Sequence, residues 1–302
     1  MDARILDLPL DPSALDGLSE QLVRSHHQNN YVGAVKRLNA IRGQLRDTAF
    51  AAIPGYQLNG LKREELVATN SMLLHELYFA GLGGAARPMA PAMALALSAN
   101  FGSVERWRDE FVAMGKALGG GSGWVLLTFQ PREGTLVNQW AADHTHALAG
   151  GIPVLVLDMY EHAYHLDFGA AAGRYVDAFM DNIDWAEIYR RYQLAVEQAS
   201  EPIAATADDL AGAVLVDVRR AGVFDAADTL IEGARWRDPN DVARWATELS
   251  SGADVVVYCV YGHEVGRATA MRLRAAGVEA RFLRGGFEGW KAAGRALQPK
   301  LG

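Results

Sequence analysis

Several features that would place this chain in common protein classes are scarce or missing. Cysteine occurs once in 302 residues, at Cys259, which excludes an intrachain disulfide. There is no run of about 18 uninterrupted apolar residues, so we expect no membrane span. Lys and Arg number 29 against 36 Asp and Glu, and this net charge of −7 argues against a general nucleic-acid binder. The start, residues 1–7, lacks the basic segment and apolar core of a secretory signal, so we expect a cytoplasmic protein.

The residues that are present predict more than one hydrophobic core. Half of them are apolar, and the length suggests about two domains. The character of the chain changes near residue 200. There the segment 197–207 is small and polar with one proline, which indicates a linker or a domain start.

The most informative stretch is the segment 158–164, which follows the apolar run 152–157. It places the carboxylate of Asp158 four residues before the imidazole of His162, at the end of a predicted buried strand. A carboxylate and a neutral imidazole can together bind a first-row transition metal. Two ligands do not complete a site, so others must come from elsewhere in the chain.

Two predicted helices supply candidate ligands. Residues 17–45 contain His26 and His27, and residues 70–79 contain His75 on an apolar face. One histidine from each helix would complete a set of three imidazoles and one carboxylate. Such a set suits a redox-active iron or manganese ion with an open coordination position.

With these motifs the sequence resembles the iron/manganese superoxide dismutase family over roughly residues 15–195. The family's metal signature, Asp-x-Trp-Glu-His-Ala-Tyr, corresponds to residues 158–164, with Tyr160 at the tryptophan position. The other landmarks occur in order, namely His75 with Phe79, Asn-Phe-Gly-Ser at 100–103, Gly-Ser-Gly-Trp at 121–124 and Asn-Ile-Asp-Trp at 182–185. The resemblance implies superoxide as substrate and one Fe or Mn per subunit, bound by His26, His75, Asp158 and His162.

The first ligand requires a choice between two adjacent histidines. Leu38 and Asn39 resemble the family's Leu-Asn pair in the same helix and select His26, with His27 as the alternative. On this register an outer histidine of the family becomes Asn30 and its gateway tyrosine becomes Ala34. A further family tyrosine is His165 here. Because groups around the ligands tune a metal site, these changes concern rate and metal preference more than metal binding.

The resemblance also implies a Gln or His that hydrogen-bonds solvent at the metal. We expect His144 in this role, because an archaeal-type Asn-His pattern aligns with Asp143 and His144; Gln139 and His146 are the alternatives. Trp124, Tyr160 and Phe79 would form an apolar wall that admits only small species, or would be ordinary core.

Glu161 lies inside the signature, beside a ligand. In the resembling family this acid pairs across a dimer interface with the partner's ligand histidine. The resemblance therefore implies a homodimer in which Glu161 reaches His162 of the other subunit, since burial of an unpaired acid is costly.

The C-terminal third alternates predicted strands and helices. Residues 213–218, 254–259 and 280–283 read as buried strands, and residues 240–249 and 265–276 as helices, the second closed by Gly277. This order predicts a small domain with a parallel sheet.

Cys259 lies between a predicted strand and a helix, where backbone N–H groups and the positive helix end would lower its pKa and bind an anion. With Asp217-Val218-Arg219 and the Gly-Gly-Phe-x-x-Trp at 285–290, the segment 205–298 resembles the rhodanese domain. The resemblance implies that Cys259 accepts sulfane sulfur from a donor and passes it to a thiol acceptor. Here the loop has His263 and Glu264 where a cation is usual, so we expect poor thiosulfate binding.

Three functional hypotheses follow. The leading one is an Fe- or Mn-dependent superoxide dismutase with an appended sulfurtransferase-like domain. The others are a sulfur-handling enzyme whose metal domain acts on a species held by Cys259, and a non-catalytic metal-bound scaffold. The expected fold is multi-domain: an α-helical hairpin at 1–85, an α+β half with an antiparallel sheet at 86–198, and an α/β rhodanese-like domain at 205–302.

Overall fold

The computed structural model describes residues 2–83, 88–250 and 252–300. The chain forms two compact units. Unit 1 comprises Met1–Thr128 and Val137–Tyr189, and unit 2 comprises Phe129–Leu136 and Arg190–Gly302. The predicted boundary between residues 85 and 86 lies outside the described residues, and the bounds of the three predicted segments stay predictions.

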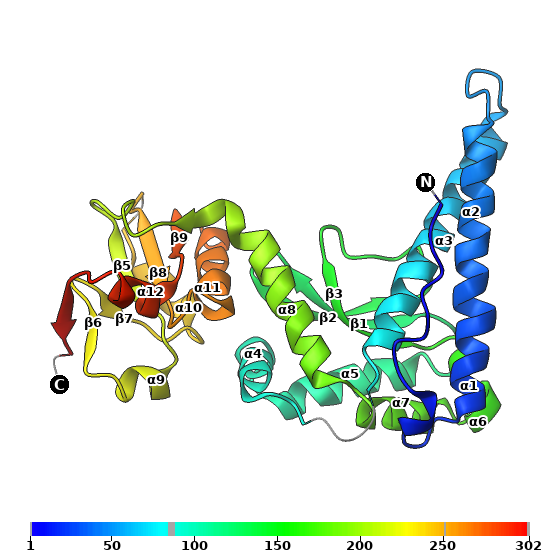
Figure 1. The fold of residues 1–302 in the computed structure, drawn as a ribbon, viewed down its shortest axis with the longest axis horizontal. Coiled ribbons are helices and arrows are strands. Elements are labelled where there is room, and N and C mark those ends of the chain that lie inside the picture. Colours follow the sequence, from blue (N-terminus) through cyan, green and yellow to red (C-terminus); the bar gives the residue numbers. More distant parts are fainter. Residues whose placement is uncertain (1, 84–87, 251, 301–302) are drawn as a thin grey trace. The chain divides into compact units, whose positions relative to one another are not determined.

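Unit 1 begins with the predicted helical hairpin (Figure 1). Helix α1 (Glu20–Ser25) is capped by Ser19, whose side chain accepts a hydrogen bond from the Leu22 N–H. A π-helical turn (His26–Tyr31) joins it to α2 (Val32–Arg46), which is followed by α3 (Gly55–Ala80). Leu38 on α2 packs with Ala68 on α3 in a buried cluster, which holds the two long helices together.

The second half of unit 1 is the predicted α+β part around an antiparallel sheet, with strand order β2-β1-β3. Its helices are α4 (Pro91–Phe101), α5 (Val104–Ala117), α6 (His165–Phe168), α7 (Ala172–Asp181) and the first turn of α8 (Trp185–Ser200); its strands are β1 (Trp124–Gln130), β2 (Thr135–Ala141) and β3 (Ile152–Asp158). Gly123 precedes β1 with φ +138°, and a Cβ there would lie 2.2 Å from the Ala141 carbonyl oxygen. Only glycine lets these backbones approach so closely.

Unit 2 contains a parallel five-stranded sheet with the order β4-β9-β8-β5-β7, as the sequence predicts for an α/β domain. Its strands are β4 (Ala204–Ala205), β5 (Val214–Asp217), β7 (Arg235–Trp236), β8 (Val255–Tyr258) and β9 (Ala280–Leu283); β6 (Thr229–Ile231) pairs separately with β10 (Leu297–Pro299). Its helices are α9 (Ala221–Asp225), α10 (Val242–Trp245), α11 (Glu264–Ala275) and α12 (Gly286–Ala292).

One prediction for this region needs correction. The expected helix at 240–249 is only α10 followed by a 3-10 turn (Ala246–Glu248), although Trp245 is buried as expected. Of the two alternatives for the segment 197–207, a linker or a domain start, the structure supports the domain start, because α8 runs to Ser200 and is followed by a 3-10 turn (Glu201–Ile203) and β4, the first strand of the five-stranded sheet. Its polar residues are helix-end residues, and Arg267 of α11 donates to the Ser200 hydroxyl at 3.0 Å.

The tip of the β1–β2 hairpin belongs to unit 2, where it packs on α11. Gly134 has φ +64°, and a Cβ there would lie 2.7 Å from the Ala268 carbonyl oxygen. Arg272 of α11 donates to the Gly134 carbonyl at 3.3 Å, and the ring of Phe129 meets Tyr192 of α8 edge-on. Within the described ranges, the helices are all too short or too polar to cross a membrane.

Candidate functional site

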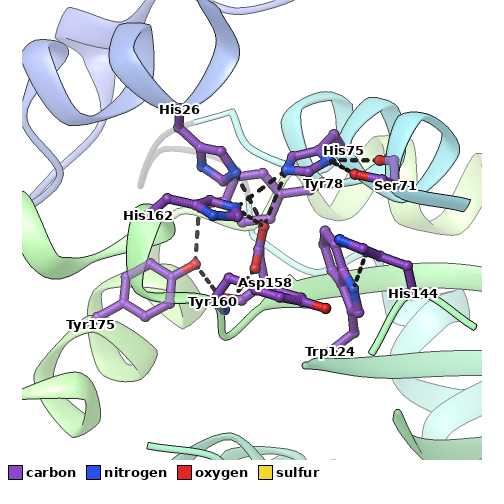
Figure 2. A network of polar contacts seen from close by, with 10 residues as sticks. All are labelled: His26, Ser71, His75, Tyr78, Trp124, His144, Asp158, Tyr160, His162 and Tyr175. Carbon is purple, nitrogen blue, oxygen red and sulfur yellow. Dashed lines mark hydrogen bonds and ion pairs between the residues drawn. The ribbon is translucent and has the colours of Figure 1, made fainter. Parts of the chain in front are cut away.

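Four side chains from distant parts of unit 1 converge at one point (Figure 2). They are His26 at the start of the π-helical turn, His75 near the end of α3, Asp158 at the end of β3 and His162 in the 3-10 turn Glu161–Ala163. One ligand atom from each lies within 4.8 Å of those of the others. The Asp158–His162 spacing noted in the sequence works because a turn follows the strand and carries His162 back over the strand end.

The nitrogen atoms of the three imidazoles face the carboxylate. Nε2 of His26 lies 3.1 Å and Nε2 of His162 lies 3.2 Å from Oδ2 of Asp158, and Nε2 of His75 lies 3.5 Å from the same oxygen. Nδ1 of His75 is 2.6 Å from the Ser71 carbonyl oxygen, which can only accept. Nδ1 therefore carries the proton, and the Nε2 lone pair of His75 points toward the other ligand atoms.

Burial sets the protonation of this cluster. It lowers the pKa of His26, and it lowers the pKa of His75 to about 3, so both imidazoles are neutral at pH 7. Burial opposes ionisation of Asp158, but His162 and His26 outweigh it and hold the carboxyl pKa below its usual range. Neutral imidazoles around one carboxylate are the donor set that a first-row transition metal takes, so these residues fit an Fe or Mn ion.

The backbone and the buried tyrosines hold Asp158 in place. The Tyr160 N–H donates to Oδ1 of Asp158 at 2.8 Å. The Tyr175 hydroxyl lies 2.8 Å from the Asp158 carbonyl oxygen and 3.2 Å from the Tyr78 hydroxyl, with all three residues buried. Sequence reasoning did not find Tyr175, because no local pattern links it to a residue 17 positions away. The i, i+4 spacing of Ser71 and His75 on one helix could have suggested their contact.

His144 lies beside the cluster, on the side of the apolar wall. Its Nδ1 is 3.0 Å from the Trp124 indole nitrogen, and its ring stacks on Tyr160 with centroids 4.7 Å apart. Because an indole N–H is only a donor, Nδ1 of His144 accepts and its proton is on Nε2. Burial raises the pKa of Tyr160 to about 12, with a further contribution from the charge of Asp158, so this phenol is neutral.

The alternative residues lie elsewhere. His27 is outside the cluster and approaches the Leu6 carbonyl oxygen with Nε2 at 3.0 Å. His146 accepts a hydrogen bond from the Ala142 N–H and its ring lies tilted against the exposed Trp140, and Gln139 accepts from the Thr128 hydroxyl.

Two positions near the cluster differ from the family's pattern, with Asn30 in place of the outer histidine and Ala34 in place of the gateway tyrosine. The π-helical turn changes the direction of the side chains that follow His26. Buried Tyr31 donates to Glu76 and accepts from the Leu6 N–H, and Ala34 is buried while Asn30 is partly exposed. His165 is exposed at the start of α6.

Glu161 and His162 are the accessible part of the signature. The side chain of His162 is 25% exposed, whereas those of His26, His75 and Asp158 are at most 1% exposed. Glu161 is exposed in the single chain.

Unit 2 places Cys259 directly after β8 and before α11, as expected from the sequence. The prediction of a lowered thiol pKa is wrong. Burial raises the pKa of Cys259, and this outweighs the N–H groups of Gly266, Gly262 and His263, which favour the thiolate; the charge of Glu264 raises the pKa further. Asp217 and Arg219, which also carry the resemblance to the rhodanese domain, form a buried bidentate ion pair.

Comparison with known proteins agrees with this geometry. Residues 89–191 match the C-terminal domain of iron/manganese superoxide dismutases, and residues 196–293 match the rhodanese-like domain. The chain is 61% identical over 189 residues to a superoxide dismutase [Fe] of Cupriavidus metallidurans, covering 63% of this chain and 95% of that protein. It is 35% identical over 198 residues to superoxide dismutase [Mn] 1 of Halobacterium salinarum, with coverage of 63% and 95%. It is 33% identical over 196 residues to a superoxide dismutase [Fe] of Aquifex pyrophilus, with coverage of 62% and 90%. The chain therefore belongs to the iron/manganese superoxide dismutase family and carries a rhodanese-like domain in its C-terminal third.

Proposed function

We propose that this protein is an Fe- or Mn-dependent superoxide dismutase. The observation that carries the proposal is the buried cluster of His26, His75, Asp158 and His162, whose ligand atoms lie within 4.8 Å of one another. A bound Fe or Mn ion would supply a one-electron couple, by which superoxide is oxidised to dioxygen in one half-reaction and reduced to hydrogen peroxide in the other. The names of the similar dismutases support the same assignment.

The residues of the chain have distinct roles in this proposal. Asp158 contributes the single negative charge among the ligands, and Tyr175 and the Tyr160 N–H fix its orientation. His144 presents its Nε2–H as a hydrogen-bond donor, because Trp124 occupies Nδ1. Trp124, Tyr160 and Phe79 surround the cluster with aromatic surface, which limits the site to small species. The reduction half-reaction consumes two protons, and in this proposal His144 delivers one of them.

Metal analysis and superoxide dismutation on the same purified sample test the proposal. We expect one Fe or Mn per chain together with fast dismutation. His75→Ala and Asp158→Ala should lose both the metal and the activity, whereas His27→Ala should keep the metal, because His27 faces Leu6. Metal-loaded protein without dismutation would instead support the scaffold hypothesis, and metal loss in His27→Ala would refute the ligand assignment.

We also propose a homodimer through Glu161 and His162. The exposure of both side chains in the single chain supports this proposal. A second subunit that covers Glu161 would bury its carboxylate, which then needs a pairing group such as a histidine. Sedimentation should give a dimer for the native protein and a monomer for Glu161→Lys. A native monomer with full dismutation would refute it. The cytoplasmic compartment stays a prediction.

A second proposed function is sulfur transfer at Cys259, in which a sulfane-sulfur donor hands its sulfur to the thiol and a thiol acceptor removes it. The rhodanese-like match and the N–H groups of the Cys259 loop favour it. We expect Cys259→Ser to abolish sulfur transfer and to leave dismutation unchanged. Loss of dismutation in Cys259→Ser would support the coupled, sulfur-handling hypothesis in its place.

A further inference from the structure

The loop after Cys259 combines groups that attract negative charge with one that repels it. The N–H groups of Gly266, Gly262 and His263 point toward the thiol and favour its anionic form. Gly266 lies so close that a Cβ there would be 3.4 Å from Sγ of Cys259. Glu264, the first residue of the twelve-residue helix α11, lies among these groups.

Glu264 is a buried carboxylate at this position. Its side chain is 8% exposed, and Arg220 lies 3.8 Å from its Oε1. A negative charge at a helix N-terminus is favourable for the helix, but it occupies the place where an anionic ligand would gain the same stabilisation. The charge of Glu264 also acts on Cys259 and opposes a second negative charge there.

Two of the nearby arginines already have acceptors in the protein. Arg267 donates to the Gly262 carbonyl at 2.8 Å and to the Ser200 hydroxyl at 3.0 Å, and its guanidinium stacks on Phe282. Arg219 donates hydrogen bonds to both oxygens of Asp217. Arg267 and Arg219 are therefore engaged by the protein itself.

A cavity of about 300 Å³ adjoins the loop within unit 2. The loop side of its wall is His263, Glu264 and Arg267, and the opposite side is formed by Arg190, Gln193, Leu194 and Glu197 of α8. This volume is at the lower end of the range for small-molecule sites. Glu264 therefore faces this cavity as well as influencing Cys259.

We propose that Glu264 sets the charge preference of the Cys259 site, so that it accepts sulfur from uncharged or cationic carriers and rejects anionic donors such as thiosulfate. This rests on the proposed sulfur transfer. The sulfur carrier is the persulfide of a neutral thiol, R–S–SH. The Cys259 thiolate attacks the outer sulfur, a bond forms between Sγ and that sulfur, and the S–S bond of the donor breaks. The leaving RS⁻ takes the electron pair and ends as R–SH with the proton lost by Cys259, so there is no net oxidation.

The sole cysteine makes a direct test possible, because any thiol reaction of the intact protein is at Cys259. We would measure rates of alkylation by iodoacetate, which is anionic, and by iodoacetamide, which is neutral. The thiolate attacks the CH₂ carbon of both reagents and displaces iodide, so the ratio of the two rates cancels any change in thiol pKa and reports the charge that the reagent meets. Glu264→Gln should raise the iodoacetate/iodoacetamide ratio about tenfold, the scale of one unit charge a few ångströms away in a partly buried site.

Two variants serve as controls. Glu264→Asp keeps the charge and should keep the native ratio, which separates charge from shape. Glu279→Gln makes the same substitution at an exposed acid beside the start of β8, whereas Cys259 follows the end of that strand. It should also leave the iodoacetate/iodoacetamide ratio unchanged. An unchanged ratio in folded Glu264→Gln would overturn the inference.

Sulfur transfer from thiosulfate and from a neutral alkyl persulfide would then be compared. Native protein should prefer the persulfide, and Glu264→Gln should gain thiosulfate turnover by a similar factor. Equal use of both donors by the native protein would overturn the charge preference. If no donor transfers sulfur, the proposed second function fails, while the alkylation ratio still decides the role of Glu264.

Discussion

The hydroxyl pair behind Asp158 gives a prediction whose size can be worked out from the structure. Tyr175 lies 2.8 Å from the Asp158 carbonyl oxygen and 3.2 Å from the Tyr78 hydroxyl. A carbonyl can only accept, so the single proton of Tyr175 goes to Asp158. The Tyr78 hydroxyl must then donate to the oxygen of Tyr175.

This order of donors predicts unequal costs for two conservative substitutions. Tyr175→Phe leaves a buried carbonyl and a buried hydroxyl without a partner, and we expect it to lower the free energy of unfolding by about 1–3 kcal/mol. Tyr78→Phe removes one donor and leaves the Tyr175–Asp158 bond intact, so we expect about 0.5–1.5 kcal/mol. In the double variant only the carbonyl lacks a partner, so its cost should be well below the sum of the two single costs.

Urea unfolding of the three variants and the native protein, all metal-loaded, measures these differences. Far-ultraviolet circular dichroism should be unchanged before the transition, because both substitutions keep the aromatic ring. A larger cost for Tyr78→Phe than for Tyr175→Phe would refute the donor order. Costs that simply add would show that the two hydroxyls do not act together.

Three further predictions concern other parts of the chain. Gly134→Ala should destabilise unit 2 by about 1–3 kcal/mol more than Gly212→Ala, because both glycines of unit 2 have positive φ but only Gly134 would bring a Cβ against α11; equal urea midpoints would contradict this. Because burial raises the pKa of Cys259, the midpoint of its pH profile for iodoacetamide alkylation should lie above about 8.5, the pKa of an ordinary thiol; a midpoint at or below that pH would refute it. Chelation of the metal should lower the melting temperature of unit 1, because bound metal adds up to about 4 kcal/mol to the free energy of unfolding at a thousandfold excess over Kd. Added Fe or Mn should restore the melting temperature. An unchanged melting temperature in protein shown to have lost its metal would argue against binding at a preformed site.

Sequence reasoning recovered the fold where local patterns carry it. The apolar runs at 152–157, 254–259 and 280–283 became β3, β8 and β9, and Gly277 follows the end of α11 with φ +86°. The helix expected at 240–249 is shorter and ends in a 3-10 turn, although Val242, Trp245 and Ala246 are all buried, so the apolar pattern located the buried face but not the length of the helix. Periodicity also could not show the π-helical turn at His26–Tyr31, since one extra residue per turn leaves no local composition signal.

The candidate site was predictable to the extent that it follows from spacing and order. His75, Asp158 and His162 could be named from two motifs, and Leu38 selected His26, which the structure places in the cluster while His27 faces Leu6. The pKa of Cys259 could not be predicted, because it depends on burial by segments far away in the sequence. For the same reason the sequence could show Glu264 beside the cysteine but not that its carboxylate is buried.

Two fully buried aspartates show why one place in this chain is suited to a cation and the other is not. Asp217 is 0% exposed and is neutralised by both guanidinium bonds of Arg219, so its charge is balanced by the protein. Asp158 is also 0% exposed, but its side-chain partners are imidazoles, and burial keeps His26 and His75 neutral. A buried carboxylate whose neighbours are lone-pair donors is stabilised by a metal cation and not by the fold alone. The same burial that neutralises the histidines therefore makes them better ligands, and it ties metal binding to the correct packing of unit 1.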